Sequence, residues 1–299
     1  MSPGRRPSAA DASSITESVA LAPAARREAL LRAIAGARRR LVLSLFRCDD
    51  EGVVEALAAA VRRGVKVEAL LTRRARRGRK ALSRLHASLA GMGATVAWFA
   101  DPVVKYHAKY LVADDSTSLV MTLNPTRKCF TRTWDAVVTT NDASVARSLL
   151  GLFDADAAGL PPVFDRDFSR RVVVGPEGSR RDVHGLIRGA RRSIAILDHK
   201  LADPDVVTLL RERRAAGVEV TVVGKDLPPP LVAHGKLMVV DEARALVGSL
   251  ALSTLSLDFR REVALIVDDP ALVQPLAAGV RTLAGQAGAR CRRLPGDPS

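Results

Sequence analysis

Aromatic residues, cysteines and long apolar runs are all scarce in this chain. Phe, Tyr and Trp make up 4% of its 299 residues, which is thin for a surface that stacks the bases of single-stranded nucleic acid. The three cysteines, Cys48, Cys129 and Cys291, are far apart and form no CxxC pair, which argues against a disulfide framework or a structural zinc site. Apolar runs such as residues 41–46 have the length of a strand, well short of the roughly 18 residues that span a bilayer.

The amino terminus lacks the apolar stretch of a signal peptide. Arg5 and Arg6 are followed by small and polar residues, whereas a secretory signal needs an apolar segment after its basic start. We therefore expect a flexible tail over residues 1–20. We also expect a protein of the reducing cytoplasm that can act peripherally at the inner face of the membrane.

Acidic residues are outnumbered, because 46 Lys and Arg stand against 32 Asp and Glu, a formal net charge of +14. Such a charge favours a polyanionic partner, either nucleic acid or an anionic lipid surface. However, 38 of the basic residues are Arg and only eight are Lys, a bias that a GC-rich genome produces without selection for binding. The run RRARRGRK at residues 73–80 likewise has two interpretations, a polyanion-binding loop beside a cleft or a solvated loop.

A sequence repeat organises the chain. GARRRLVLSLF at residues 36–46 recurs as GARRSIAILDH at residues 189–199. Each copy continues with an amphipathic helix that ends at a glycine, Gly64 or Gly217, and with a second apolar strand. The first copy then carries an extra helix and strand within residues 73–100. Alternating strands and helices predict a parallel sheet covered by helices.

We therefore predict an α/β fold of two tandem repeats, each a mostly parallel sheet flanked by helices. Duplicated units of this kind pack against each other, and we expect them to share one active site. The predicted segments are a first repeat, a linker, a second repeat and a carboxy-terminal tail, at residues 21–158, 159–170, 171–285 and 286–299.

The most informative similarity lies in a second shared block. HAKYLVADDSTSLVMTLN at residues 107–124 aligns without a gap with HGKLMVVDEARALVGSLA at residues 234–251, at an offset of 127 residues. The alignment continues to an acid in each copy and pairs His107 with His234, Lys109 with Lys236, Asp114 with Asp241, Thr122 with Ser249, and Asp135 with Glu262. Residues i and i+2 of a strand face the same side, so the His and Lys of each HxK point together into a pocket.

Two imidazoles and two amines suit attack on a phosphodiester. One imidazole attacks phosphorus while the other, protonated, gives its proton to the leaving alkoxide, and His is the side chain that titrates near neutral pH. Lys109 and Lys236 would hold the non-bridging oxygens, with Asn124, Thr122 and Ser249 as further donors. The sequence offers no clustered metal ligands, so we expect no metal and no other cofactor.

The acids of the block have two different expected roles. Asp135 and Glu262 can each accept the Nδ1 proton of an imidazole, so that Nε2 faces the phosphorus. Asp114 and Asp241 lie at odd spacing from the lysines and face away from the pocket. We interpret them as structural acids that bond backbone or a basic side chain. Of the other histidines, only His199, at a strand end, is placed to line the cleft.

The doubled block resembles the phospholipase D superfamily, whose signature is HxKxxxxD followed six residues later by GSxN. The resemblance covers residues 25–285 and implies a phosphohistidine intermediate, no metal, and one site between two α/β lobes. It also implies that His107 is the nucleophile and His234 the general acid. In the same way it implies that Glu262 orients His107 and Asp135 orients His234.

The chain departs from that signature in each copy, since MTLN places Met121 at the Gly position and GSLA places Ala251 at the Asn position. We expect a phospholipase D-type phosphodiesterase that hydrolyses or transfers the headgroup of glycerophospholipids at a membrane surface, with no obligate protein partner. The alternative, based on the basic charge, is a metal-independent endonuclease that binds nucleic acid. A third hypothesis, based on Met121 and Ala251, is a catalytically weak phosphate-binding scaffold.

Overall fold

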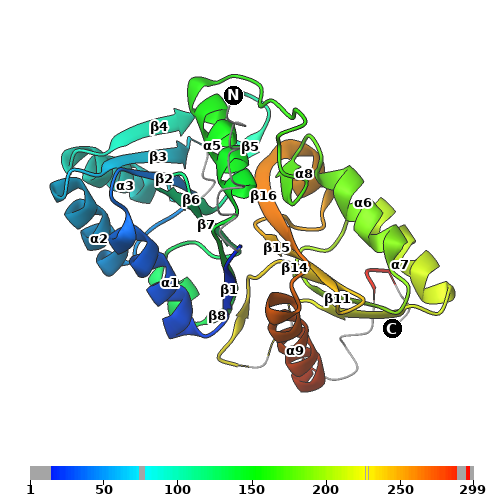
Figure 1. The fold of residues 1–299 in the computed structure, drawn as a ribbon. Coiled ribbons are helices and arrows are strands. Elements are labelled where there is room, and N and C mark those ends of the chain that lie inside the picture. The colour runs from blue at the N-terminus through cyan, green and yellow to red at the C-terminus, as the bar shows by residue number, and fades with distance from the viewer. Residues whose placement is uncertain (1–14, 74–77, 226, 228, 288–293, 297–299) are drawn as a thin grey trace, which may run out of the picture.

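The computed structural model describes residues 15–73, 78–225, 227, 229–287 and 294–296, which build two large β-sheets with helices on their faces (Figure 1). The helices of the first repeat are α1 (Pro23–Gly36), α2 (Glu51–Arg62), α3 (Arg79–Gly91), α4 (Arg127–Thr131) and α5 (Ala143–Ala158). Its strands are β1 (Glu17–Ala20), β2 (Arg40–Leu45), β3 (Lys66–Thr72), β4 (Thr95–Phe99), β5 (Lys105–Tyr106), β6 (Tyr110–Ala113), β7 (Thr117–Met121), β8 (Thr133–Trp134) and β9 (Val137–Thr140).

The second repeat follows the same order without the extra helix and strand. Its helices are α6 (Ser179–Gly189), α7 (Pro204–Ala215), α8 (Thr254–Phe259) and α9 (Pro270–Ala287). Its strands are β10 (Val172–Gly175), β11 (Ser193–Leu197), β12 (Glu219–Val223), β13 (Val232–Ala233), β14 (Leu237–Val240), β15 (Arg244–Gly248) and β16 (Arg260–Val267). The predicted extra segment of the first repeat is α3 with β4. Both repeats therefore carry the α/β organisation that the sequence predicts.

Local sequence signals set the helix boundaries in both repeats. Asp50 and Asp203 each precede a helix and accept, at the side chain, the backbone N–H three residues later, which satisfies a donor that the first turn leaves unpaired. After α2 and α7 the chain turns at Gly64 and Gly217, whose φ angles are 86° and 89°. A side chain disfavours this left-handed conformation, so the predicted helix stops are confirmed.

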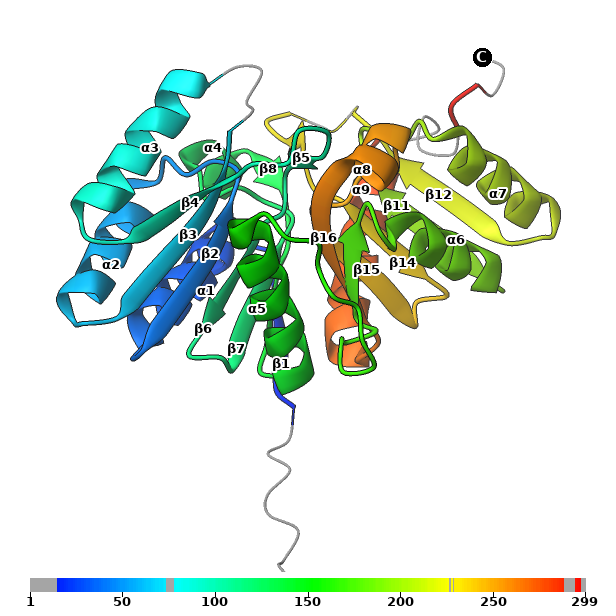
Figure 2. The ribbon, with the colours of Figure 1, turned by 90° about the horizontal axis from the view of Figure 1, so that it is seen from above.

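Three apolar cores lie between the helices and the sheets. α5 and α9 pack between the two sheets and form one inner core with strands of both repeats (Figure 2). α1, α2 and α3 cover the outer face of the first sheet, and α6, α7 and α8 cover that of the second. Strand residues alternate between the cores: Leu41 and Leu43 of β2 face outward and Val42 faces inward. The shared inner core joins the repeats.

The strand directions correct one expectation, because the sheets are mixed and not mostly parallel. The strand order is β1-β9-β7-β6-β2-β3-β4 in the first sheet and β10-β16-β15-β14-β11-β12 in the second. Neighbouring strands are parallel in β2-β3-β4 and in β11-β12. All other neighbours in these orders are antiparallel. The reason is that each HxK block folds as an antiparallel hairpin, β6–β7 or β14–β15. Its turn places Asp114 and Asp115, or Asp241 and Glu242, at positive φ, as a tight hairpin turn requires.

The two repeats exchange short strands beside each motif histidine. β5 ends just before His107 and pairs in parallel with the start of β16. β13 ends just before His234 and pairs in parallel with β8, which ends just before Asp135. Because β16 carries Glu262 directly after the paired residues, each histidine-bearing segment lies alongside the acid-bearing segment of the other repeat.

Part of the predicted amino-terminal tail is a strand, which corrects the boundary at residue 20. β1 pairs antiparallel with β9, and the N–H of Thr16 donates to the side-chain oxygen of Asn141 at 2.6 Å. The strand forms because β9 would otherwise present an unpaired edge. Other parts of the predicted tails and of the basic run lie outside the described residues, together with Cys291: residues 1–14, 74–77, 288–293 and 297–299.

Residues 159–170 connect α5 to β10 without a helix or strand of their own. None of the helices in the described ranges combines the length and the apolar character that crossing a membrane takes.

Candidate active site

His107 and Glu262 form a buried pair across the two repeats. The imidazole Nδ1–H of His107 donates to Oε2 of Glu262 at 2.9 Å, and the two side chains are 13% and 0% exposed. The backbone is fixed as well, because the N–H of His107 donates to the carbonyl oxygen of Arg261 at 2.9 Å. The pairing leaves Nε2 as the ring nitrogen without a carboxylate partner.

His234 and Asp135 form the equivalent pair. Nδ1–H of His234 donates to Oδ1 of Asp135 at 2.9 Å, and Asp135 is fully buried. The carboxylate also accepts hydrogen bonds from the hydroxyls of Thr122 and Thr133, and the guanidinium of Arg26 lies 3.6 Å from it. Asp135 is therefore fixed on several sides, and it fixes the ring of His234 in turn.

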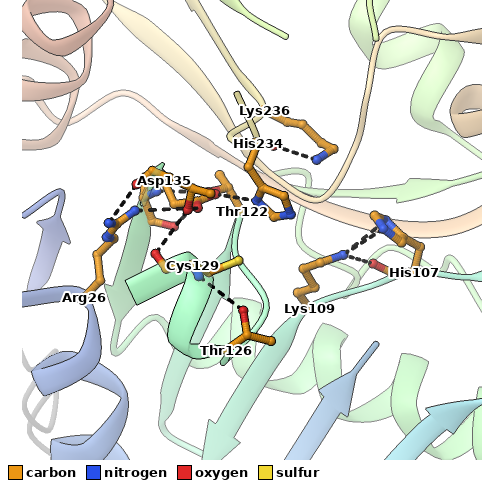
Figure 3. A network of polar contacts seen from close by, with 11 residues as sticks. Arg26, His107, Lys109, Thr122, Thr126, Cys129, Asp135, His234 and Lys236 are labelled. Atoms are coloured by element: carbon orange, nitrogen blue, oxygen red, sulfur yellow. Dashed lines mark hydrogen bonds and ion pairs between the residues drawn. The ribbon is translucent and has the colours of Figure 1, made fainter. Parts of the chain in front are cut away.

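Both motif lysines are buried beside the imidazoles, with Lys109 0% and Lys236 3% exposed. Each amine donates to the carbonyl oxygen of its own motif histidine, at 2.7 and 2.9 Å. Nζ of Lys109 also lies 3.1 and 3.2 Å from Nδ1 and Nε2 of His107. Figure 3 shows the imidazole of His234 pointing toward Lys109 and His107. The structure thus brings the four HxK residues together between the repeats.

Burial lowers the pKa of both imidazoles, so both are neutral in the free protein at neutral pH. For His107, burial and the positive charges of Lys109 and Lys236 outweigh the attraction of Glu262, and the pKa falls to about 3. Burial and the same two lysines lower the pKa of His234 against the pull of its carboxylate partner. A neutral His107 whose Nδ1 proton is held by Glu262 presents a lone pair at Nε2, which is the form a nucleophile needs.

The two carboxylates stay ionised although burial by itself raises their pKa. The imidazole of His107 and the amine of Lys109 outweigh burial and hold the pKa of Glu262 at about 2. The hydrogen bonds from His234, Thr122 and Thr133 lower the pKa of Asp135 in the same way. Burial also holds the pKa of Lys109 well below its ordinary value. Buried cations of this kind are stabilised by an incoming anion, so the site is suited to a phosphate.

The two motif hydroxyls do not face the cleft, which corrects their predicted role in phosphate binding. Thr122 and Ser249 are fully buried. Oγ1 of Thr122 donates to Asp135 and accepts the N–H of Ala136, while Oγ of Ser249 donates to the carbonyl oxygen of Val263 and accepts the N–H of the same residue. Each hydroxyl fastens the segment that carries the acid of its own repeat and has no proton left for a substrate.

Asn124 differs from the hydroxyls, because its buried Oδ1 has no hydrogen-bond partner among the residues that the structure describes. At the equivalent position Ala251 offers no amide. There the hydroxyl of Ser256 accepts the N–H of Ala251 and donates to Oε1 of Glu262 at 2.8 Å. Met121, at the other departure from the signature, packs in the outer core of the first sheet. Neither departure disturbs the paired imidazoles.

Asp114 and Asp241 lie at the hairpin turns and do not contact the imidazoles. The carboxylate of Asp114 accepts the backbone N–H groups of residues 38–40 at 2.7 to 3.1 Å. That of Asp241 accepts those of residues 191–193 at 2.6 to 3.1 Å. Burial would raise the pKa of both carboxyls, but these bonds lower it. The acids fasten each hairpin to the start of β2 or β11, which is a structural role.

Some residues beside the imidazoles carry no motif signal. The ring of Phe46 lies 4.8 Å from that of His107. Its equivalent in the GARR alignment, at an offset of 153 residues, is His199, which lies close enough to His234 for the two rings to interact electrostatically. The one sequence signal that could have indicated Phe46 is its position at the end of the GARR alignment, where the strand of each repeat ends. Buried Arg26 donates to the carbonyl oxygen of Thr133 at 2.9 Å, and no sequence pattern indicated it.

Two groups in the described part of the chain place potential metal ligands within 4.8 Å of one another: Cys129, Asp135 and His234, and His184, Asp203 and Asp205. In the first group the carboxylate already accepts bonds from an imidazole and two hydroxyls. In the second, Asp203 caps α7 and binds Arg180. Both groups are organised as hydrogen-bond networks around a carboxylate.

Comparison with known proteins supports the repeat and its fold. The family model for “Cardiolipin synthase, PLD-like domain” matches residues 30–157 and 181–283. The structure of a polyphosphate kinase from Porphyromonas gingivalis is similar with a TM-score of 0.71 and 20% identity over 89% of this chain, which spans 46% of that protein. Phosphatidylserine synthase from Haemophilus influenzae is similar with a TM-score of 0.67 and 13% identity, over 90% of this chain and 85% of that one.

No curated protein matches the sequence, and at these identities the two solved structures show a common fold. The family model, however, covers most of both repeats, including both HxK blocks. The chain therefore belongs to the phospholipase D superfamily, in the family described as “Cardiolipin synthase, PLD-like domain”.

Proposed function

We propose that this chain is a phospholipase D-type phosphodiesterase that hydrolyses or transfers the headgroup of glycerophospholipids through a phosphohistidine on His107. The observation that carries the proposal is the pair of crossed hydrogen bonds, from His107 to Glu262 and from His234 to Asp135. Each joins an imidazole of one repeat to a buried carboxylate of the other. Two oriented imidazoles at one position supply a nucleophile and a general acid.

In the first step, Nε2 of neutral His107 forms a bond to phosphorus while the bond between phosphorus and the headgroup oxygen breaks. The leaving oxygen takes a proton from His234. The anionic diester raises the pKa of His234 when it binds, so that this proton is present. The amines of Lys109 and Lys236 stabilise the charge on the non-bridging oxygens.

In the second step, His234 accepts a proton from water, or from an alcohol if the group is transferred. The oxygen so activated bonds to phosphorus, and the bond from phosphorus to Nε2 of His107 breaks. Glu262 and Asp135 remain ionised throughout and hold the Nδ1–H of each ring, which keeps Nε2 directed at phosphorus. The only proton that moves is the one on Nε2 of His234, which passes to the leaving oxygen in the first step and is regained from water or alcohol in the second.

Two observations support a phospholipid as the substrate. The matching family is described as cardiolipin synthase-like, and a net charge of +14 attracts the chain to an anionic bilayer surface without an anchor. On these grounds we propose that the protein acts peripherally at the inner face of the membrane.

The test is headgroup release from vesicles of phosphatidylcholine, phosphatidylethanolamine and phosphatidylglycerol in EDTA, with linear DNA as a parallel substrate. We expect release by wild type and loss with His107→Ala. His184→Ala is the matched control, because it removes a histidine on α6 outside the site, and it should release headgroup like wild type. A loss specific to His107 also rules out the phosphate-binding scaffold, whereas intact lipid in the wild-type reaction overturns the proposal.

The second candidate, an endonuclease, rests on the same charge of +14. A nuclease binds DNA with an affinity that falls steeply with salt, because each neutralised phosphate releases counterions. Cleavage of DNA that depends on His107 would favour this candidate, and DNA affinity that barely changes with salt would exclude it.

A further inference from the structure

The two imidazoles of the site have different neighbours. β2 ends next to Phe46, whose ring packs on His107, and the guanidinium of Arg47 lies 5.4 Å from the centroid of the Phe46 ring. At the equivalent end of β11 the chain places His199 and Lys200. His107 therefore has an aromatic ring beside it, whereas His199 and Lys200 lie within electrostatic reach of Lys236, and His199 also of His234.

His199 has an unused polar atom inside the protein. Its Nδ1 is buried and has no hydrogen-bond partner in the described part of the chain. Burial and the charges of Lys236, Lys200 and His234 lower its pKa to about 4, so the ring is neutral and can donate one hydrogen bond. A buried polar atom without a partner is costly. The ring of His199 is not held at Nδ1 by the described residues and can therefore offer its N–H to a ligand.

Lys200 is a half-buried cation whose surroundings are also cationic. Its backbone N–H donates to Asp198 at 2.8 Å, but among the described residues no carboxylate forms an ion pair with its amine. Asp198 accepts a second backbone N–H, from Leu252, at 2.6 Å. Burial and the positive charges of Lys236 and Arg260 lower the pKa of Lys200. An anion beside the amine would relieve that repulsion.

The formal charges that surround Lys200 do not balance with one phosphodiester. Four cations and two carboxylates act on one another here: Lys109, Lys236, Lys200, Arg260, Glu262 and Asp198. Four minus two leaves two positive charges, and a bound diester supplies one negative charge. On the other side, Asp135 already has Arg26 beside it. One positive charge therefore remains for a second anionic group.

We propose that His199 and Lys200 form a subsite for a second anionic group, a carboxylate or a phosphate, carried by the leaving alcohol of the substrate. This inference rests on the proposed function, in which His234 protonates the leaving oxygen, so that the headgroup departs on the side where His199 and Lys200 lie. The preferred substrate is then a phospholipid whose headgroup is itself anionic. Phe46, beside His107, faces the part of the substrate that stays on phosphorus.

The test measures binding without turnover, by titration calorimetry on the full chain carrying His107→Ala. The probes are glycerophosphoserine and glycerophosphocholine, two soluble diesters of which only the first has a second anion. We expect glycerophosphoserine to bind about tenfold more tightly, since one charged hydrogen-bonded contact has that value. Adding Lys200→Met should reduce the preference to less than about twofold, and adding Arg47→Met, the equivalent position in the first repeat, should leave it unchanged.

A thymidine dinucleotide with and without a terminal phosphate is titrated in parallel. If Lys200 contributes only to binding of the phosphorylated dinucleotide, the subsite stands while the phospholipid assignment fails, because the second anion then comes from nucleic acid. Equal affinities within both pairs of probes, or a preference that survives Lys200→Met in a variant with wild-type circular dichroism, would overturn the subsite.

Discussion

Each motif histidine depends on a carboxylate that the other repeat supplies. Glu262 is fully buried, yet the imidazole of His107 and the amine of Lys109 hold its pKa at about 2. Such an acid stays ionised over the whole range in which an imidazole titrates. It can therefore accept the Nδ1 proton of His107 at every working pH and keep one tautomer populated.

The depressed pKa values predict an acidic optimum for kcat/KM. This ratio reports ionisation in the free enzyme. His107, the proposed nucleophile, has a pKa of about 3 and stays neutral above it, while His234, the proposed general acid, has a pKa lowered from 6.5 and loses its proton before neutrality. We expect kcat/KM to fall about tenfold per pH unit above that point. The optimum of kcat should lie at a higher pH than that of kcat/KM, because bound diester raises the pKa of His234. A value of kcat/KM that rises toward alkaline pH would contradict these assignments.

Glu262→Gln should lower kcat by a factor on the order of 10³ to 10⁴, because an amide can hold the ring in the wrong tautomer. KM should change little, since Gln keeps the size of the side chain. The readout that separates positioning from folding is the pH profile, which should shift in the variant while urea unfolding stays near that of wild type. An equal loss of stability and activity would instead indicate a structural role.

At this scale the motif alignment named the two imidazoles and the two acids, because a constant offset carries equivalent residues to equivalent places. Their crossed pairing was implied only by the resemblance to the phospholipase D superfamily. The alignment assigned the wrong role to Thr122 and Ser249. A strand pattern predicts which face of the sheet a side chain is on, but not which backbone groups its hydroxyl will bond. Phe46 and Arg26 were missed because contacts between distant elements leave no periodic signal.

Among the elements, the hairpin acids and the exchanged strands position the site. Asp114 and Asp241 fasten the turns of β6–β7 and β14–β15 to the start of the neighbouring strands β2 and β11, by accepting backbone N–H groups there. β5 and β13 carry each histidine to the opposite repeat. Sequence periodicity indicated the strands and helices, but not the mixed direction of the sheets, because an apolar strand has the same pattern beside parallel and antiparallel neighbours. The exchanged strands β5 and β13 have two residues each and are too short to show a periodic sequence pattern.

Asp114→Ala should destabilise the fold by about 1 to 3 kcal/mol, because backbone N–H groups lose their acceptor in a partly buried turn. Turnover per folded molecule should remain near that of wild type, since the carboxylate does not contact the imidazoles. Urea unfolding and activity of the same preparation measure the two effects. A large fall in kcat without loss of stability would show that the acid acts in the reaction.

Across the whole molecule, the inner core and a buried ion cluster hold the two repeats at a fixed distance. Arg261 of β16 donates to Asp156 of α5 at 3.0 Å and to the carbonyl oxygen of Gly175 at 2.8 Å, and it also binds Glu177. The cluster links the repeats directly behind the strand that carries Glu262. The repeat predicted from the sequence made a shared core plausible, whereas Asp156 lies outside every motif.

The same cluster predicts a pH dependence of stability. Burial raises the pKa of Asp156 to about 7, against the attraction of Arg261. Because the folded pKa is above the unfolded one, the folded state binds the extra proton. This contribution is complete below about pH 4 and is lost as pH rises through about 7, at up to about 1.4 kcal/mol per pH unit. In urea unfolding, the free energy of wild type relative to Asp156→Asn should decrease from pH 4 to pH 8. An increase over that range would contradict the raised pKa.

The central claim, a covalent bond between phosphorus and His107, is tested most directly by trapping the intermediate. Short-chain phospholipid is mixed with wild type and with His234→Ala, the reaction is quenched in alkaline denaturant, and peptides are analysed by mass spectrometry. The account predicts a phosphatidyl adduct on the peptide that contains His107, enriched in His234→Ala because the second step then lacks its base, and absent from His107→Ala. An adduct on His234 or on a serine, or headgroup release with no adduct at any time, would contradict it.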